Sequence, residues 1–513
     1  MNYRPLTVAW CLAILLLAVT GANGLYVLEL VQVLHRHGVR PPPAETPNRA
    51  KMCSPNGSSN CTAIANRGVE QMTAMGAYIQ QLYSGDAATS GSATWFQSPY
   101  DVSAVYTRAL ADPATAQAAA ALLRGVYAKD GASAVPTVIS APPEQDTLLN
   151  VEAFPSLSVA KRVDAAALNR SLASVVDETF PDAGVLGAMG AEVGLDAVCS
   201  APANRVACCQ HLQKLATMYA AAGATDGAPT VMANRAKLDV VAAAEFRALQ
   251  GYNASSPLDA ARGSLGQPLA QELLRNMRQK MLPEGDANRN TRKLMQYAHE
   301  VPVGTALGHN PSGVTPLGET FLVDLLRDDA TQAFFVRLRY AVPGNGAAAA
   351  AAAAAAFPFR CLSAAKVPTS ATTADGIVCP FDDFARFVES SRGTSPAGAV
   401  CYLDEGVRKE FACEVEGAAP SQACARYRAL CPSQACPEGH VYDAGSGACK
   451  TRVVLSNVVS NSAGVGVGVA AVACGFLLSL FIMQLCPMLF LKDFGDVQGR
   501  SRDAAEAAVA LRQ

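Results

Sequence analysis

The sequence predicts an α/β protein: a doubly wound, mostly parallel sheet flanked by helices, with an inserted, mainly helical cap and a single carboxyl-terminal transmembrane helix. The first observation is residues 27–34, VLELVQVL, which are too continuously apolar for a half-solvated strand and indicate a parallel strand buried on both faces. The second is an alanine-rich stretch of about 127–280, which lacks strand patterns and predicts the cap. The third is the apolar stretch 465–491.

The two ends of the chain predict targeting segments. Residues 1–24 carry a basic residue, an apolar core and then small residues, the pattern of a cleavable secretory signal peptide. No charged residue occurs between Arg452 and Lys492, so 465–491 can span a bilayer, and 492–513 becomes a short cytoplasmic tail. We therefore expect a type I single-pass protein of the plasma membrane or an endosomal or lysosomal membrane, with the intervening chain on the lumenal or extracellular side.

Two arginines flank a histidine directly after the first predicted strand. Arg36 and Arg40 supply guanidinium forks that match the oxygens of a phosphate ester in paired, charge-assisted hydrogen bonds. His37 can attack phosphorus and form a phosphohistidine. Open α/β sheets bind ligands at the carboxyl ends of their strands, so this segment predicts a phosphoryl-transfer site.

The pattern Arg-His-Gly-x-Arg-x-Pro, which begins at Arg36, resembles the signature of the histidine acid phosphatases. Arg108 follows the strand-like segment 103–107, where that family supplies its third phosphate-binding arginine. Residues 293–300, KLMQYAHE, resemble the strand that ends in the family's second histidine and its adjacent carboxylate. Residues 315–340 resemble a hairpin late in the family's chain.

The resemblance implies a catalytic domain over 25–393, with His37 as nucleophile and Glu300 as proton donor. It assigns the binding of phosphoryl oxygens to Arg36, Arg40, Arg108 and His299. Glutamate stands here in place of the family's usual aspartate. An ordinary glutamic acid has a pKa of about 4.3, so an acidic optimum is expected. For the nearby His35 we expect a packing or supporting role. No His-Glu-x-x-His motif and no aspartate–histidine cluster surrounds the signature, so we expect neither metal nor cofactor.

Cysteines and sequons agree with a lumenal chain. Setting aside Cys11, Cys474 and Cys486 leaves thirteen of the 16 cysteines as disulfide candidates: Cys53, Cys61, Cys199, Cys208, Cys209, Cys361, Cys379, Cys401, Cys413, Cys424, Cys431, Cys436 and Cys449. Because this number is odd, at least one thiol is free or pairs between chains, the second case giving a covalent homodimer. The dense cysteines of 394–460 predict a membrane-proximal stalk. Glycosylation sequons begin at Asn56, Asn60, Asn169 and Asn253.

Together these features predict an acid phosphatase, a phosphoric monoester hydrolase, similar to the membrane-bound acid phosphatases of protozoa. A specialised inositol-phosphate or lysophospholipid phosphatase ranks lower, because 41–52 adds only Arg49 and Lys51 as basic residues for a highly phosphorylated substrate. A different class is a catalytically weak surface receptor or adhesion protein that binds through its stalk; the complete histidine and arginine set argues against it. The formal net charge of −2 gives nucleic-acid binding no support.

Overall fold

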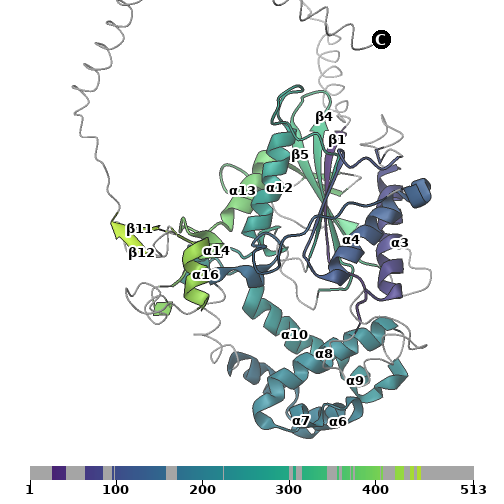
Figure 1. The fold of residues 1–513 in the computed structure, drawn as a ribbon, viewed down its shortest axis with the longest axis vertical. Coiled ribbons are helices and arrows are strands. Elements are labelled where there is room, and N and C mark those ends of the chain that lie inside the picture. The colour runs from purple at the N-terminus through teal and green to yellow at the C-terminus, as the bar shows by residue number, and fades with distance from the viewer. Residues whose placement is uncertain are drawn as a thin grey trace, which may run out of the picture. The chain divides into compact units, whose positions relative to one another are not determined.

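The computed structural model divides the chain into two compact units, Met1–Lys450 and Thr451–Gln513. It describes residues 26–41, 64–84, 95–96, 99–133, 135–156, 170–222, 225–299, 304–307, 315–343, 355–356, 361–369, 371–373, 376–404, 406–407, 422–432, 440–443 and 448–451. The architecture of the first unit is a sheet between helices, together with a separate group of helices (Figure 1).

The central sheet has eight strands in the order β2-β3-β1-β4-β5-β10-β9, with β6 pairing with β5. Their bounds are β1 (Tyr26–His35), β2 (Val105–Ala109), β3 (Leu294–Ala298), β4 (Thr320–Asp328), β5 (Phe334–Ala341), β6 (Ala355–Ala356), β9 (Ala371–Thr373) and β10 (Gly376–Pro380). Two short sheets pair β7 (Cys361–Leu362) with β8 (Pro368–Thr369), and β11 (His440–Asp443) with β12 (Ala448–Thr451).

The sheet is mixed, so the expectation of a mostly parallel sheet is wrong. β2, β3 and β1 run parallel to one another, whereas β4 lies antiparallel to β1 and each later strand is antiparallel to its neighbour. The expected late hairpin forms as β4 and β5, and it accounts for the antiparallel pairing of these two strands, because a short turn joins only antiparallel strands. β1 is nevertheless buried on both faces, as predicted, with Leu30, Val31 and Val33 fully inaccessible to solvent.

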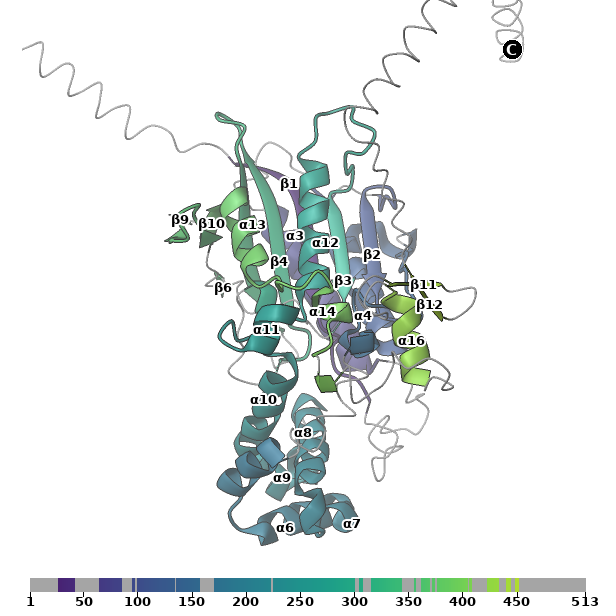
Figure 2. The ribbon, with the colours of Figure 1, turned by 90° about the vertical axis from the view of Figure 1, so that its left-hand side faces the viewer.

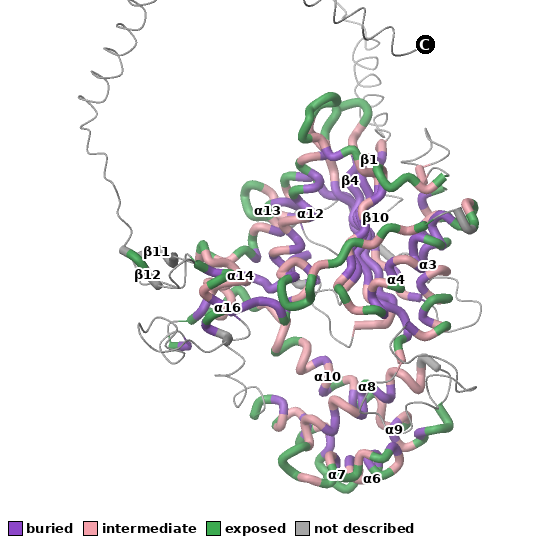
Figure 3. Tube along the Cα trace, viewed as in Figure 1, coloured by how far each residue is buried: buried purple, intermediate pink, exposed green. Residues whose placement is uncertain are grey.

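Helices cover both faces of the sheet (Figures 1 and 2). On one face lie α3 (Asn66–Ser84) and α4 (Pro113–Val126), which share a core with Val31 and Val33. These two helices approach closely at Gly76, where an added Cβ would lie 1.9 Å from the carbonyl oxygen of Leu122. On the other face lie α12 (Gln267–Lys280) and α13 (Phe381–Ser390). Burial concentrates along the sheet and the helix faces that contact it (Figure 3).

A further group of helices has a core of its own. Its members are α6 (Ala183–Val193), α7 (Asp196–Cys199), α8 (Arg205–Ala222), α9 (Pro229–Ala233) and α10 (Arg235–Gln250). The short helix α11 (Pro257–Arg262) follows them along the chain and contributes no residue to that core. Phe180, Leu212 and Leu238 belong to the core of this group. Short 3-10 helices are η2 (Ala128–Ser133), η3 (Val151–Ala153), η4 (Pro202–Asn204), η5 (Thr225–Gly227) and η6 (Gly304–Leu307).

Helix α12 falls inside the stretch 127–280 that the sequence assigns to the cap, yet it packs on the sheet. Leu273 and Met277 recur at helical spacing and share the sheet's core with Leu34. The Lys280 ammonium at the end of α12 donates to the carbonyl of Arg292, just before β3 begins. The strand β3 therefore runs back along α12, and its carboxyl end lies where α12 starts. Figure 2 shows α6 to α10 beyond that end of α12.

Part of the predicted stalk also packs on the sheet-bearing domain. In this part lie α14 (Gly398–Cys401) and α16 (Gln422–Leu430). Ala399 shares a core cluster with Phe154, and Arg426 donates to the carbonyl oxygen of Ala153 at 2.9 Å. The described helices α14 and α16 are therefore docked on the domain, which buries Ala399.

Disulfides join Cys199 to Cys208, Cys361 to Cys379 and Cys401 to Cys431, and Cys424 is disulfide-bonded as well. Among the described cysteines Cys209 is free and buried, and burial raises the pKa of its thiol to about 12. Of the sequons, that of Asn253 lies on the exposed surface. Outside the described residues lie the sites and segments Asn56, Asn60, Asn169, Cys53, Cys61, Cys413, Cys436, 1–24, 465–491 and 492–513, and nothing is described of the side chain of Cys449. Within the described ranges, no helix combines the length and apolarity needed to cross a bilayer.

Candidate active site

The candidate residues gather at the carboxyl edge of the three parallel strands. His35 at the end of β1 is paired with Ala298 of β3, and the latter with Ala109 of β2. The next residue after β3 is His299, whose backbone N–H donates to the carbonyl of His35 at 3.0 Å. The structure thus brings His37 and the three arginines to one edge with His299, while Glu300 lies outside the described residues.

The ring of His37 is buried and held in one tautomer. Its Nδ1 lies 2.7 Å from the carbonyl oxygen of Gly38. A carbonyl oxygen only accepts hydrogen bonds, so Nδ1 carries the proton and the lone pair of the neutral ring is on Nε2. Gly38 permits a close approach to α3, because an added Cβ there would lie 2.7 Å from the carbonyl oxygen of Gly68. Neutral His37 therefore carries a nucleophilic nitrogen on Nε2.

Arg40 is tied to the first turn of α4. Its Nη2 lies 3.0 Å from Asp112 Oδ1, while Asp112 Oδ2 accepts the backbone N–H of Thr115 and so caps the helix. Burial pushes the pKa of Asp112 upward, but the hydrogen bonds from Thr115 and the charges of Arg40 and His37 outweigh it and hold the pKa below its usual value. Sequence reasoning missed Asp112, although Asp-Pro before an alanine-rich helix is a recognisable capping signal.

Arg108 is held by a carboxylate in the interior. Its Nη2 lies 2.8 Å from Oδ1 of Asp146, whose side chain is fully buried. The same oxygen accepts the backbone N–H groups of Leu148 and Leu149, which fix the carboxylate in its turn. A guanidinium has five donors, so this single contact orients Arg108 and leaves donors for an anion. Nothing in the local sequence of Asp146 marks it as a partner of β2.

Arg36 is held from the start of β4. Its backbone N–H donates to the carbonyl oxygen of Glu319 at 2.8 Å, and its Nη1 donates to the carbonyl of Thr315. The Glu319 carboxyl is 2% exposed and accepts the hydroxyl of Tyr340 at 2.8 Å. Burial raises the pKa of Glu319 to about 7, although the Tyr340 hydrogen bond and the charge of Arg36 act in the opposite direction. Glu319 is a third carboxylate that sequence reasoning missed, after Asp112 and Asp146, because only the pairing of β4 with β1 places it here.

A buried network beneath the edge joins the three parallel strands. His35 donates from Nδ1 to the carbonyl of Arg36 and accepts at Nε2 from Gln296 of β3, at 2.7 Å. The Gln296 side chain accepts the hydroxyl of Thr107 on β2. Burial lowers the pKa of His35 to about 4. The hydrogen bond to the backbone of Arg36 opposes this shift, and the charge of His37 adds to it. His35 is neutral in mild acid, and its expected supporting role is confirmed.

The chemistry of this edge is that of an anion site with a nucleophile. Arg36, Arg40 and Arg108 each have a partner that orients the guanidinium, and His37 lies among them. Over the described ranges, no group of three or more His, Cys, Asp or Glu side chains could hold a metal ion. The arrangement can bind a doubly charged phosphoryl group and offer it a ring nitrogen.

No protein-family model matches the chain, and no curated protein matches it. Among solved structures, the chain is similar to the phytase of Klebsiella sp ASR1, at 16% identity and a TM-score of 0.47, over 74% of this chain and 100% of the other. The phytase of Citrobacter braakii gives 15% identity and a TM-score of 0.48, over 71% and 98%. The phytase of D. castellii gives 12% identity and a TM-score of 0.40, over 72% of this chain and 80% of the other.

Proposed function

We propose that the chain is an acid phosphatase of the histidine acid phosphatase type, which hydrolyses phosphate monoesters through a phosphohistidine. The observation that carries the proposal is the placement of His37, with its lone pair on Nε2, at one sheet edge with three oriented arginines. Phosphoryl transfer needs neutralised oxygens around a positioned nucleophile, and these side chains supply both.

The first half-reaction transfers the phosphoryl group to the enzyme. Guanidinium forks of Arg36, Arg40 and Arg108 bind the non-bridging oxygens. Nε2 of His37 forms a bond to phosphorus as the bond to the ester oxygen breaks, and the departing oxygen takes a proton from a carboxylic acid. We assign that acid to Glu300, in keeping with the sequence resemblance, and His299 to the binding of a phosphoryl oxygen.

The second half-reaction regenerates the enzyme. Water attacks phosphorus, the nitrogen–phosphorus bond breaks, and the carboxylate of Glu300 takes the proton of the water. Inorganic phosphate and an alcohol are the products. The arginines need no rearrangement between the two halves, because their partners hold them before substrate arrives.

The proposal includes a location. A cleaved signal peptide at 1–24 and a transmembrane helix at 465–491 would place the enzyme on the lumenal or extracellular face of the plasma membrane or of an endosomal or lysosomal membrane. Three disulfides support an oxidising compartment. The orientation can be tested in selectively permeabilised cells with one antibody against the catalytic domain and one against a carboxyl-terminal tag. If both antibodies reach their targets equally from outside, the proposed orientation is contradicted.

Hydrolysis of 4-nitrophenyl phosphate by the full-length chain in detergent, from pH 4 to 8 without added metal, tests the activity. We expect an acidic optimum and loss of turnover in His37→Ala, whereas His211→Ala, a half-exposed histidine of α8, should keep wild-type rates. A ³²P-labelled substrate should leave an acid-labile, alkali-stable label on the wild type but not on His37→Ala. Turnover that survives His37→Ala contradicts the proposal. An inactive wild type would favour the alternative of a surface receptor or adhesion protein.

Glu300→Gln separates proton donation from binding. General acid–base help is worth about 10²–10⁴-fold, so kcat should fall by that factor while inhibition by inorganic phosphate persists. A substrate with a 2,4-dinitrophenol leaving group needs little protonation and should recover much of the lost rate. Unchanged kcat on a poor leaving group would remove Glu300 from the mechanism.

Phytate in the same assay separates a general phosphatase from an inositol-phosphate phosphatase.

A further inference from the structure

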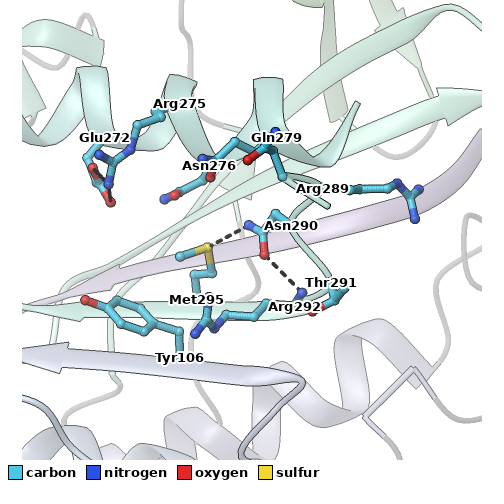
Figure 4. A pocket seen from close by; sticks show the side chains of 11 residues that line it. Tyr106, Glu272, Arg275, Asn276, Gln279, Arg289, Asn290, Thr291, Arg292 and Met295 are labelled. Carbon is cyan, nitrogen blue, oxygen red and sulfur yellow. Dashed lines mark hydrogen bonds and ion pairs between the residues drawn. The ribbon is translucent and has the colours of Figure 1, made fainter. Parts of the chain in front are cut away.

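A cavity of about 280 Å³ lies at the opposite end of the parallel strands from the candidate active site. Figure 4 shows it between α12 above and strands β2 and β3 below, with Tyr106 and Met295 projecting from the strands. Along β3, Met295 and His299 are four residue steps apart, which at about 3.3 Å per step is roughly 13 Å. The cavity is therefore distinct from the edge that carries His37.

The lining of this cavity is rich in positive charge. Arg275, Arg289 and Arg292 line it. Glu272 pairs with Arg275 at 2.6 Å, and Glu29 pairs with Arg289 at 3.7 Å from outside the lining, which leaves Arg292 without a carboxylate partner among the described residues. The neighbouring Lys280 is affected by the same charges. Burial lowers the pKa of Lys280 to about 8; the charge of Glu29 opposes this shift and the charge of Arg289 adds to it. One bound anion would balance charge that the lining leaves in excess.

Among the arginines that line the cavity, Arg292 has the least satisfied hydrogen-bond donors. Its guanidinium lies over the ring of Tyr106, 5.2 Å from the centroid, and its Nε is buried with no hydrogen-bond partner among the described residues. Leaving a buried donor without a partner is unfavourable, and a bound acceptor would supply the missing partner. Gln279 and Asn288 add amide groups to the same wall.

We propose that this cavity binds a small tetrahedral oxyanion, either free phosphate or the phosphate group of a larger molecule. Guanidinium groups match phosphate oxygens in fork geometry, and amides supply further donors. The volume lies below the range typical of sites for drug-sized ligands, so the bound group is small. The proposal does not rest on the phosphatase activity, because the cavity shares no residue with the candidate active site.

Calorimetric titration of the full-length chain with inorganic phosphate tests the site. The wild type should bind two phosphates, and Arg36→Gln, which weakens the candidate active site, should keep one of them. In that background Arg292→Gln should weaken the remaining phosphate tenfold or more, and Arg275→Gln, at an exposed position that folding tolerates, should also weaken it. Arg278→Gln removes one charge from the exposed face of the same helix, outside the cavity, and should change nothing.

Benzylphosphonate, whose carbon–phosphorus bond resists hydrolysis, distinguishes the two sources. Binding as tight as that of inorganic phosphate assigns the cavity to the phosphate group of a larger molecule, and exclusion of benzylphosphonate assigns it to the free anion. A single phosphate in the wild type that Arg36→Gln abolishes overturns the proposal, as does unchanged affinity in both Arg292→Gln and Arg275→Gln. Absent hydrolysis with two bound phosphates would refute the phosphatase activity alone.

Discussion

The interior of the candidate active site and its solvent-facing rim hold their arginines in different ways. In the interior, the Arg108 side chain is 23% exposed and pairs with a carboxylate that is fully buried. At the rim, the Arg40 side chain is 45% exposed and pairs with Asp112, which solvent also reaches. The two distances, 2.8 and 3.0 Å, are nearly equal, so distance alone does not separate them.

The difference in burial sets what each pair contributes. In a buried ion pair, whichever charge loses its partner keeps its desolvation cost, so the interior pair is coupled to folding. A pair in water is screened and contributes little net stability, so the rim pair acts mainly by aiming a guanidinium. We therefore expect substitutions in the interior to change the free energy of unfolding, and those at the rim to change substrate binding.

The largest expected effect is that of Asp146→Ala. The substitution leaves the Arg108 guanidinium without its counter-charge and two backbone N–H groups without their acceptor. Breaking such a pair typically costs about 3–5 kcal/mol, and partial exposure of Arg108 favours the lower end. Urea unfolding with disulfides intact measures the loss, and Asp177→Ala, whose side chain is exposed, is the control. A loss under about 1 kcal/mol would show that the interior pair is no more coupled to folding than the rim pair.

Glu319 adds a titrating carboxyl to the interior. Its pKa rises from 4.5 to about 7 in the folded protein, so between these values the folded state binds more protons than the unfolded state. Its contribution to stability is therefore complete below about pH 4.5 and lost as pH rises through 7, at most roughly 3 kcal/mol. Glu319→Gln should flatten the fall in unfolding free energy between pH 5 and 7.5, whereas Glu178→Gln, at an exposed position, should not. Identical slopes for wild type and Glu319→Gln would contradict the raised pKa.

How far the sequence predicts this site depends on how local each signal is. Arg36, His37 and Arg40 fall within five consecutive positions, so their spacing carries the chemistry. Asp112 lies next to the helix that it caps and could have been found from Asp-Pro. Asp146 and Glu319 act on arginines that are distant along the chain, through contacts that exist only after the strands pair, so no local pattern predicts them.

The fold divides in the same way. The continuous apolar sequence of β1 indicates that both of its faces are buried. A strand can be buried in this way beside an antiparallel neighbour such as β4 as well as beside a parallel one such as β3, so the pattern predicts burial but not strand direction. The leucines of α12 predict an amphipathic helix but do not say whether its apolar face meets the sheet or the neighbouring helices. Only the tertiary contacts assign α12 to the sheet.

The smallest expected effect on stability is at the rim. Asp112→Ala removes a helix cap, which costs about 1 kcal/mol, and a screened ion pair, which adds little. Its larger consequence is on binding: with its partner gone, Arg40 samples more orientations, so KM for 4-nitrophenyl phosphate should rise a few-fold with kcat nearly unchanged. Asp112→Asn keeps a capping oxygen but not the charge, and should restore the stability while keeping the raised KM. Because surface charges are screened over about 10 Å at 0.1 M salt, the difference in KM should shrink at 0.5 M. A fall in kcat with unchanged KM would instead show that Asp112 acts on His37 rather than through Arg40.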